Sequence, residues 1–174
     1  HNVQNALAAA AISYFSGIEA ETIRESLLAF GGVPHRIEYC GEIGGVKFYN
    51  DSKGTNVDAA VIALKAIQKN ILLIAGGDGK GQEFDELIEN FPGRVKHMIL
   101  LGRDGKLLAE AAERHGFKNY SFAPHMEECV KNAFAMAKPG DTVLLSPACA
   151  SWDMYDNFEQ RGDHFKTCVK RLAE

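Results

Sequence analysis

The sequence contains few cysteines, no long apolar run and no recognisable metal-binding motif, and each absence excludes a class of protein. Its four cysteines form no CxxC pair, and no HExxH motif or Cys/His cluster is present, so neither a disulfide scaffold nor a zinc site is expected. The longest nearly pure apolar run, residues 6–12, is much shorter than the roughly 20 residues of a membrane helix. No basic-then-apolar signal segment opens the chain. We therefore expect a cytoplasmic protein with no metal site and no membrane partner.

An excess of basic residues is also missing. The 174 residues include 19 Lys and Arg against 23 Asp and Glu, which gives a formal net charge of −4. Proteins that bind the nucleic-acid backbone usually carry a positive excess, so no nucleic-acid partner is expected. With 46% hydrophobic and 24% charged residues, the chain can bury a core. Because it begins with His1 instead of Met, we expect a piece of a longer protein.

Helical periodicity dominates the first part of the chain. Residues 5–15 and 19–30 are rich in Ala, Leu and Ile at helical spacing, and Ser16-Gly17 between them predicts a helical hairpin. The string GGVP that follows breaks helix propagation, and strand-like segments begin after it. We therefore predict two domains, 1–33 and 34–174.

After this boundary, short apolar runs alternate with helical periods. Strands that are apolar on both faces and separated by helices are typical of a parallel sheet covered on both sides. The prediction is an α/β, Rossmann-like domain with a mostly parallel sheet flanked by helices. We expect strands at 36–43, 46–50, 70–75, 95–101, 120–122 and 142–145, and helices at 57–67, 83–90, 106–115, 126–138 and 157–173.

A polar or glycine-rich string follows each of three predicted strands. These strings are NDSKGT at 50–55, GGDGKG at 76–81 and SPACAS at 146–151. In an open α/β sheet, ligands bind outside the carboxyl ends of the strands. We therefore expect the three strings to converge on one crevice.

Simpler interpretations of these strings stay open. GGDGKG has the spacing of neither a Walker loop nor GxGxxG, so a plain turn and an anion site around Lys80 are favoured equally. Thr55 or Asn56 can cap the helix that begins at Val57. Capping gives no role to Lys53, which the same string contains.

Other conspicuous residues have ordinary explanations. Cys149 is expected to be a small buried residue and not a nucleophile. Trp152 and Phe158 are expected in the core more than against a ligand, and Asp141 is expected to be a surface charge. His35 either lines a site or caps a strand. Taken alone, the residue pattern predicts an anion-binding α/β domain.

Five strings, in this order, resemble the Mur ligases of bacterial cell-wall synthesis. The resemblance extends from His1 to about Lys170 and favours the D-glutamate-adding members over those that add a diamino acid. It implies the C-terminal, amino-acid-accepting domain, preceded in 1–33 by the last helices of a central ATPase domain. The strings are HNVQNALAAAAI, GVPHRIE, FYNDSKGTN, AGGDGKGQEF and LLSPACASWDMYDNFEQRGDHF.

The resemblance also implies a reaction. ATP, with Mg²⁺, phosphorylates the carboxylate of UDP-N-acetylmuramoyl-L-alanine to an acyl phosphate, and the amine of D-glutamate attacks it to form an amide in peptidoglycan biosynthesis. The resemblance places the phosphate-binding loop and the metal ligands of the family upstream of His1. The chain alone is therefore expected to be inactive.

The resemblance further assigns residues to two sites. The D-glutamate site takes Thr55, Lys80, Ser151 and Phe158. The nucleotide site takes Asn2, Asn5, Arg36 and Asp51. Positions His35 and Lys53 match neighbouring family positions with an open role.

Two positions depart from the family pattern. Gly54 stands where alanine is expected, and Trp152 stands where a smaller apolar residue or phenylalanine is usual. Either change can reshape the pocket. Two other functions stay open, namely a stand-alone nucleotide- or anion-binding module and a Mur ligase that adds a different amino acid.

Overall fold

The computed structural model describes residues 2–174, apart from the side chain of Asn2. The chain divides into two compact units, one ending at Val33 and one beginning at Pro34, and each is described by itself. The first unit is the predicted helical hairpin, made of α1 (Asn2–Phe15) and α2 (Ala20–Ala29). Gly17 ends α1 with a φ of 86°, and the Ile18 N–H donates to the Ser13 carbonyl at 3.1 Å, as in a Schellman turn.

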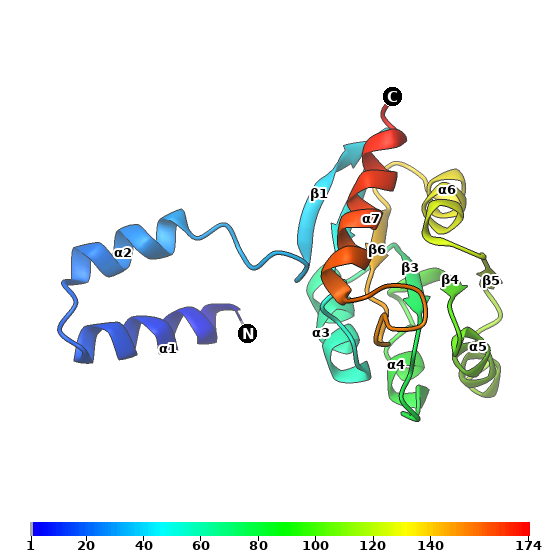
Figure 1. Ribbon diagram of the computed structural model, residues 1–174, viewed down its shortest axis with the longest axis horizontal. Helices are drawn as coiled ribbons and strands as arrows, with labels where there is room; N and C mark the ends of the chain where they lie inside the picture. The colour runs from blue at the N-terminus through cyan, green and yellow to red at the C-terminus, as the bar shows by residue number, and fades with distance from the viewer. Residues whose placement is uncertain (1) are drawn as a thin grey trace. The chain divides into compact units, whose positions relative to one another are not determined.

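The second unit contains a six-stranded sheet in the order β1-β2-β6-β3-β4-β5 (Figure 1). All neighbouring strands pair in parallel except β1, which pairs antiparallel with β2. The strands are β1 (Glu38–Ile43), β2 (Val46–Asn50), β3 (Ile71–Gly76), β4 (Val95–Leu101), β5 (Tyr120–Phe122) and β6 (Thr142–Leu145). The helices are α3 (Val57–Ile67), α4 (Asp85–Glu89), α5 (Gly105–Arg114), α6 (Met126–Met136) and α7 (Phe158–Arg171).

Two apolar cores explain why the central strands are hydrophobic on both faces. On β3, Leu73 and Ala75 pack in the core formed with α3, α4 and α5, whereas Leu72 and Ile74 pack in the core formed with α6 and α7. Successive side chains of a strand point to opposite faces, so each face of the sheet has its own helical layer. The predicted Rossmann-like α/β fold is confirmed. Within residues 2–174, no helix combines the length and the apolar character that spanning a bilayer requires.

The antiparallel β1–β2 pair is closed by a two-residue turn. Gly44 and Gly45 have φ values of 58° and 79°, which is the left-handed conformation that a tight hairpin of this type requires. Strand β1 begins at Glu38, two residues later than predicted. His35 and Ile37 have positive φ values of 62° and 46°, and this backbone does not continue a strand.

Asp141 does not have the surface position that we predicted for it. It is 4% exposed, and its Oδ2 accepts hydrogen bonds from the Lys96 ammonium at 2.6 Å and the Lys138 N–H at 2.9 Å. These partners stabilise the turn that leads into β6. The position is polar because it supplies an acceptor to a turn, a role that charge counting along the sequence does not reveal.

Candidate functional site

The candidate site lies at the carboxyl ends of three neighbouring strands. Because β2, β6 and β3 are adjacent in the sheet, the segments that follow them lie next to one another. We call these segments the Asp51 loop (51–56), the Ser151 loop (146–151) and the Lys80 loop (77–82). Hydrogen bonds join the three loops to one another, as predicted, and the crevice expected between them stays a prediction.

The Asp51 and Ser151 loops are joined through a buried carboxylate. The Ser146 hydroxyl donates to Asp51 Oδ2 at 2.7 Å, and the Asp51 N–H donates to the Leu145 carbonyl at 2.7 Å. Gly54 leaves room for this contact, because a Cβ at that position would lie 2.6 Å from Asp51 Oδ2 and 3.1 Å from Ser146 Oγ. Glycine at position 54, where alanine is expected, thus leaves free the space next to the Asp51 carboxylate.

The Lys80 and Ser151 loops are joined through their backbones. Asp78 and Ala150 exchange two backbone hydrogen bonds of 2.9 and 2.8 Å. The Gln82 amide bridges further, since its Nε2 donates to the Ala148 carbonyl at 2.5 Å and its Oε1 accepts from the Val57 N–H at 3.3 Å. All three loops therefore form one hydrogen-bonded unit with the start of α3.

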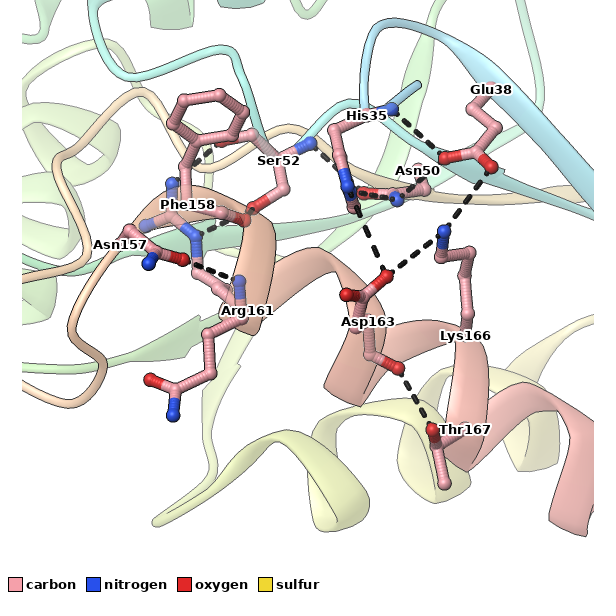
Figure 2. Close-up of polar contacts among 11 residues, drawn as sticks. His35, Glu38, Asn50, Ser52, Asn157, Phe158, Arg161, Asp163, Lys166 and Thr167 are labelled. Carbon is pink, nitrogen blue, oxygen red and sulfur yellow. Dashed lines mark hydrogen bonds and ion pairs between the residues drawn. The ribbon is translucent and has the colours of Figure 1, made fainter.

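A buried arginine, Arg161 of α7, ties the Asp51 and Ser151 loops together (Figure 2). Its guanidinium donates to the Ser52 hydroxyl at 3.0 Å, to the Ser52 carbonyl at 2.8 Å and to the Cys149 carbonyl at 3.0 Å. The residue is only 2% exposed, and burial lowers the pKa of Arg161 to about 10. No motif in the sequence singled out Arg161. The one available signal was its helical spacing with Phe165 and Cys168, which places a cation on the apolar face of α7.

Burial also dominates the acid–base behaviour of Asp51. The carboxylate is 4% exposed, and removal from water raises its pKa from an ordinary 3.8 to about 6, although the hydrogen bonds from Ser146 and the Ile37 N–H act in the opposite direction. The folded state therefore holds the Asp51 proton more tightly than the unfolded chain does. It follows that the contribution of Asp51 to the free energy of unfolding decreases as the pH rises from about 4 to about 6 and then stays level.

Substitution of Asp51 by asparagine tests this assignment. The difference between a pKa of 3.8 and one of about 6 corresponds to roughly 3 kcal/mol at neutral pH. We expect Asp51→Asn to remove most of that pH-dependent loss, because the amide carries no charge. Its Oδ1 can accept the Ile37 N–H, and its Nδ2 can donate to the Ser146 hydroxyl oxygen. Urea unfolding at pH 4 and pH 7.5 measures the effect, with exposed Asp58→Asn as the matched control. An unchanged pH dependence in Asp51→Asn would contradict the account.

His35 connects the start of the second unit to the site. The Asn50 Oδ1 accepts the Ser52 N–H at 3.0 Å, which orients the amide so that its Nδ2 faces His35 Nδ1 at 3.0 Å (Figure 2). His35 Nδ1 is therefore the acceptor in this pair. The Lys53 N–H donates to the His35 carbonyl at 3.0 Å. His35 thus contacts both the last residue of β2 and the Asp51 loop, and its role in lining a ligand site stays a prediction.

Gly162 of α7 allows this close approach. A Cβ at position 162 would collide with His35 Nδ1 and lie 2.9 Å from Asn50 Nδ2. Although alanine normally stabilises a helix by about 1 kcal/mol relative to glycine, we expect Gly162→Ala to lower the free energy of unfolding by about 1–3 kcal/mol. Chemical denaturation measures this change. A gain in stability would show that His35 and Asn50 move aside at little cost. Gly105→Ala, at a helical position where a Cβ would meet atoms no closer than 3.6 Å, is the matched control.

The residues predicted to bind D-glutamate lie on these joined elements. Lys80 is exposed, and its Nζ lies 5.4 Å from the centre of the Trp152 ring, next to Ser151. Phe158 is half-buried at the start of α7, and its carbonyl accepts the Ser52 hydroxyl at 2.7 Å. Ser151 is 3% exposed, whereas Thr55 is half-buried. Asn56, and not Thr55, caps α3 by accepting the Ala59 N–H at 2.9 Å.

Two expectations for aromatic and sulfur side chains had different outcomes. Trp152 is 67% exposed, so its predicted core position is wrong. The loop after β6 has no hydrophobic period that could have predicted its orientation. Cys149 is fully buried, as predicted, and burial raises the pKa of its thiol to about 12, which keeps the thiol protonated.

The residues predicted to bind nucleotide are divided between the two units. Arg36 is exposed beside Asp51, whose carboxylate it helps to stabilise electrostatically. Asn5 is exposed on α1, and the Asn2 side chain lies outside the described part of the chain. Within the described residues, no three His, Cys, Asp or Glu side chains form a group that could hold a metal ion.

Comparison with known proteins identifies the family of the chain. The family described as "Mur ligase, glutamate ligase domain" matches residues 35–149, which is most of the second unit. The chain belongs to the Mur ligase family. Relatives within this family include the UDP-N-acetylmuramoylalanine--D-glutamate ligases of Thermoanaerobacter sp. (strain X514), at 53% identity, and Clostridioides difficile (strain 630), at 45%.

The same two relatives show how much of a Mur ligase is present. In each case the match covers 99% of this chain but 38% of the relative, so the chain spans well under half of their length. Among solved structures, UDP-N-acetylmuramate-alanine ligase from Thermotoga maritima matches with a TM-score of 0.73 at 18% identity, over 99% of this chain and 38% of that one. E. coli FolC matches with a TM-score of 0.67 at 19% identity, over 97% and 39%. These structures share the fold.

Proposed function

We propose that the chain is the amino-acid-accepting part of an ATP-dependent ligase that adds D-glutamate to UDP-N-acetylmuramoyl-L-alanine in peptidoglycan biosynthesis. Relatives named for this activity are 45–53% identical to the chain. The observation that carries the proposal is that hydrogen bonds join the three loops. The joined loops bring an exposed lysine and two hydroxyl-bearing residues to one edge of the sheet. This edge is where ligands bind in α/β folds.

The proposed ligand explains why these residue types are gathered. D-glutamate presents two carboxylates, and each is stabilised by cations or by hydrogen-bond donors. Lys80 supplies an ammonium, Thr55 and Ser151 supply hydroxyls, and Phe158 supplies the first N–H of α7, where the helix dipole favours an anion. With both carboxylates held, the amine is left free to attack the activated substrate.

Fixing the amine lowers the entropic cost of the attack. ATP makes the carboxyl group of UDP-N-acetylmuramoyl-L-alanine reactive, with Mg²⁺ as the metal, and both would be held mainly by parts of the ligase outside this chain. The first unit, up to Val33, would then be the end of the central ATPase domain. We expect the 174-residue chain alone to form no product.

A second set of residues would contact the nucleotide. Arg36 is exposed and suits phosphate charge, while the amides of Asn2 and Asn5 suit the adenine edge. The role of Asp51 as a ribose ligand stays a prediction. Both of its carboxylate oxygens already accept hydrogen bonds from within the chain. His35 and Lys53 would act on the Asp51 loop, through the bond between the His35 carbonyl and the Lys53 N–H.

An assay of the complete ligase tests the proposal. Phosphate release is measured with ATP, Mg²⁺ and UDP-N-acetylmuramoyl-L-alanine in the presence of D-glutamate, L-lysine or meso-diaminopimelate. Of the three amino acids, we expect only D-glutamate to support phosphate release. Turnover with a diamino acid would favour a ligase of different specificity, and tight ATP binding by the 174-residue chain would favour a stand-alone nucleotide-binding module.

A further inference from the structure

Trp152 is the single tryptophan of the chain, and it has an unusual environment. It follows Ser151 directly, and 67% of its surface is exposed. A large aromatic side chain normally buries most of its surface. An indole left open beside a proposed ligand pocket therefore calls for a role that core packing does not provide.

The Lys80 ammonium lies over the face of this indole. Its Nζ is 5.4 Å from the ring centre, within the range of a cation–π contact. The backbone beneath is fixed, because Lys80 has a φ of 51° and its N–H donates to Asp78 Oδ1 at 2.9 Å. Among residues 2–174, no carboxylate lies within 4.0 Å of the Lys80 Nζ.

The second lysine near the site has the same kind of partner. Lys53 Nζ lies 5.6 Å from the centre of the Phe158 ring. Lys96 and Lys166 of this unit instead pair with carboxylates, Lys96 with Asp141 at 2.6 Å and Lys166 with Glu38 at 3.3 Å. The lysines at the site are thus held by aromatic faces, whereas Lys96 and Lys166 are held by opposite charges.

We infer that Trp152 is a positioning residue that orients the Lys80 ammonium toward the carboxylate of the bound amino acid. An aromatic face attracts a cation through its quadrupole and leaves the net charge of the cation unneutralised. A carboxylate partner would hold the ammonium equally well but would compete with the ligand for it. This inference rests on the proposed function, because it assigns Trp152 to the same D-glutamate pocket.

Three substitutions separate positioning from a simple steric role. Trp152→Phe keeps a weaker aromatic face, Trp152→Leu removes the face, and Trp152→Glu adds a competing carboxylate. We expect the Kd for D-glutamate to rise less than about 3-fold for Phe, about 3- to 10-fold for Leu and more than 10-fold for Glu. Phe122→Leu, which changes another exposed aromatic residue, is the control and should leave the Kd unchanged.

NMR titration of the isotope-labelled 174-residue chain with D-glutamate gives these constants. The ε-methylene protons of Lys80 should be shifted upfield in the unliganded wild type, which reports the contact with the indole directly. The readout that a purely structural role would not produce is the difference in Kd between Trp152→Phe and Trp152→Leu, since both side chains fill space but only Phe presents an aromatic face. Equal affinity of the wild type and Trp152→Leu would overturn the inference and leave the proposed function standing. A wild-type chain in which D-glutamate shifts no signal from the three loops would overturn both.

Discussion

Replacing Lys80 by alanine should raise the KM for D-glutamate of the proposed ligase by about one to two orders of magnitude. The reason is that hydrogen bonds to charged groups contribute about 1.5–3 kcal/mol, and Lys80 is the cation that the Lys80 loop offers to the ligand. The KM for ATP should change little, because the residues proposed for the nucleotide lie elsewhere. Steady-state kinetics with each substrate varied in turn measures both effects.

Lys118→Ala is the matched control for this experiment, since Lys118 is an exposed lysine between α5 and β5. It should leave both KM values as in the wild type. If Lys80→Ala retained the wild-type dependence on D-glutamate, the assignment of Lys80 would be wrong. A parallel rise in the KM for ATP would instead point to general damage to the site.

Replacing Arg161 by methionine should lower the free energy of unfolding by roughly 3–5 kcal/mol. Methionine fills much of the same space but leaves the Ser52 and Cys149 carbonyls, both buried, without the donors that now satisfy them. Arg161→Lys should have a smaller effect, because one ammonium cannot reach both loops with the geometry of a guanidinium. Urea unfolding gives the three free energies.

Arg171→Met, at the exposed end of α7, controls for the loss of a positive charge from the same helix. It should change the free energy of unfolding by less than about 0.5 kcal/mol. Similar losses for the two methionine variants would mean that the Arg161 hydrogen bonds contribute little. The Asp51 and Ser151 loops would then be held together by their other contacts.

The fold was largely predictable because local signals agreed with one another. Continuous apolar runs such as 71–75 are explained by a sheet with a core on each face, and the Gly44-Gly45 pair by the turn that it forms. The convergence of the loops followed from a general rule for parallel sheets. The rule locates the edge of the sheet, but it does not say which side chains connect the loops.

The parts of the site that the sequence did not predict depend on contacts between residues far apart in the chain. Arg161 donates to Ser52, which is 109 positions away, and Ser146 donates to Asp51 over 95 positions. No period or motif within a short window reports such pairs. The exposure of Trp152 was missed for a related reason, since the indole contacts a lysine of another loop and no period in its own loop reports that contact.

A crystal structure of the complete ligase with D-glutamate bound is the most direct measurement of the central claim. We predict one ligand molecule at the carboxyl ends of β2, β6 and β3, with its carboxylates within hydrogen-bonding distance of Lys80 and of donors from Thr55, Ser151 or Phe158. A D-glutamate molecule bound away from this edge, or in contact with a single loop, would contradict the claim that the three loops form one amino-acid site.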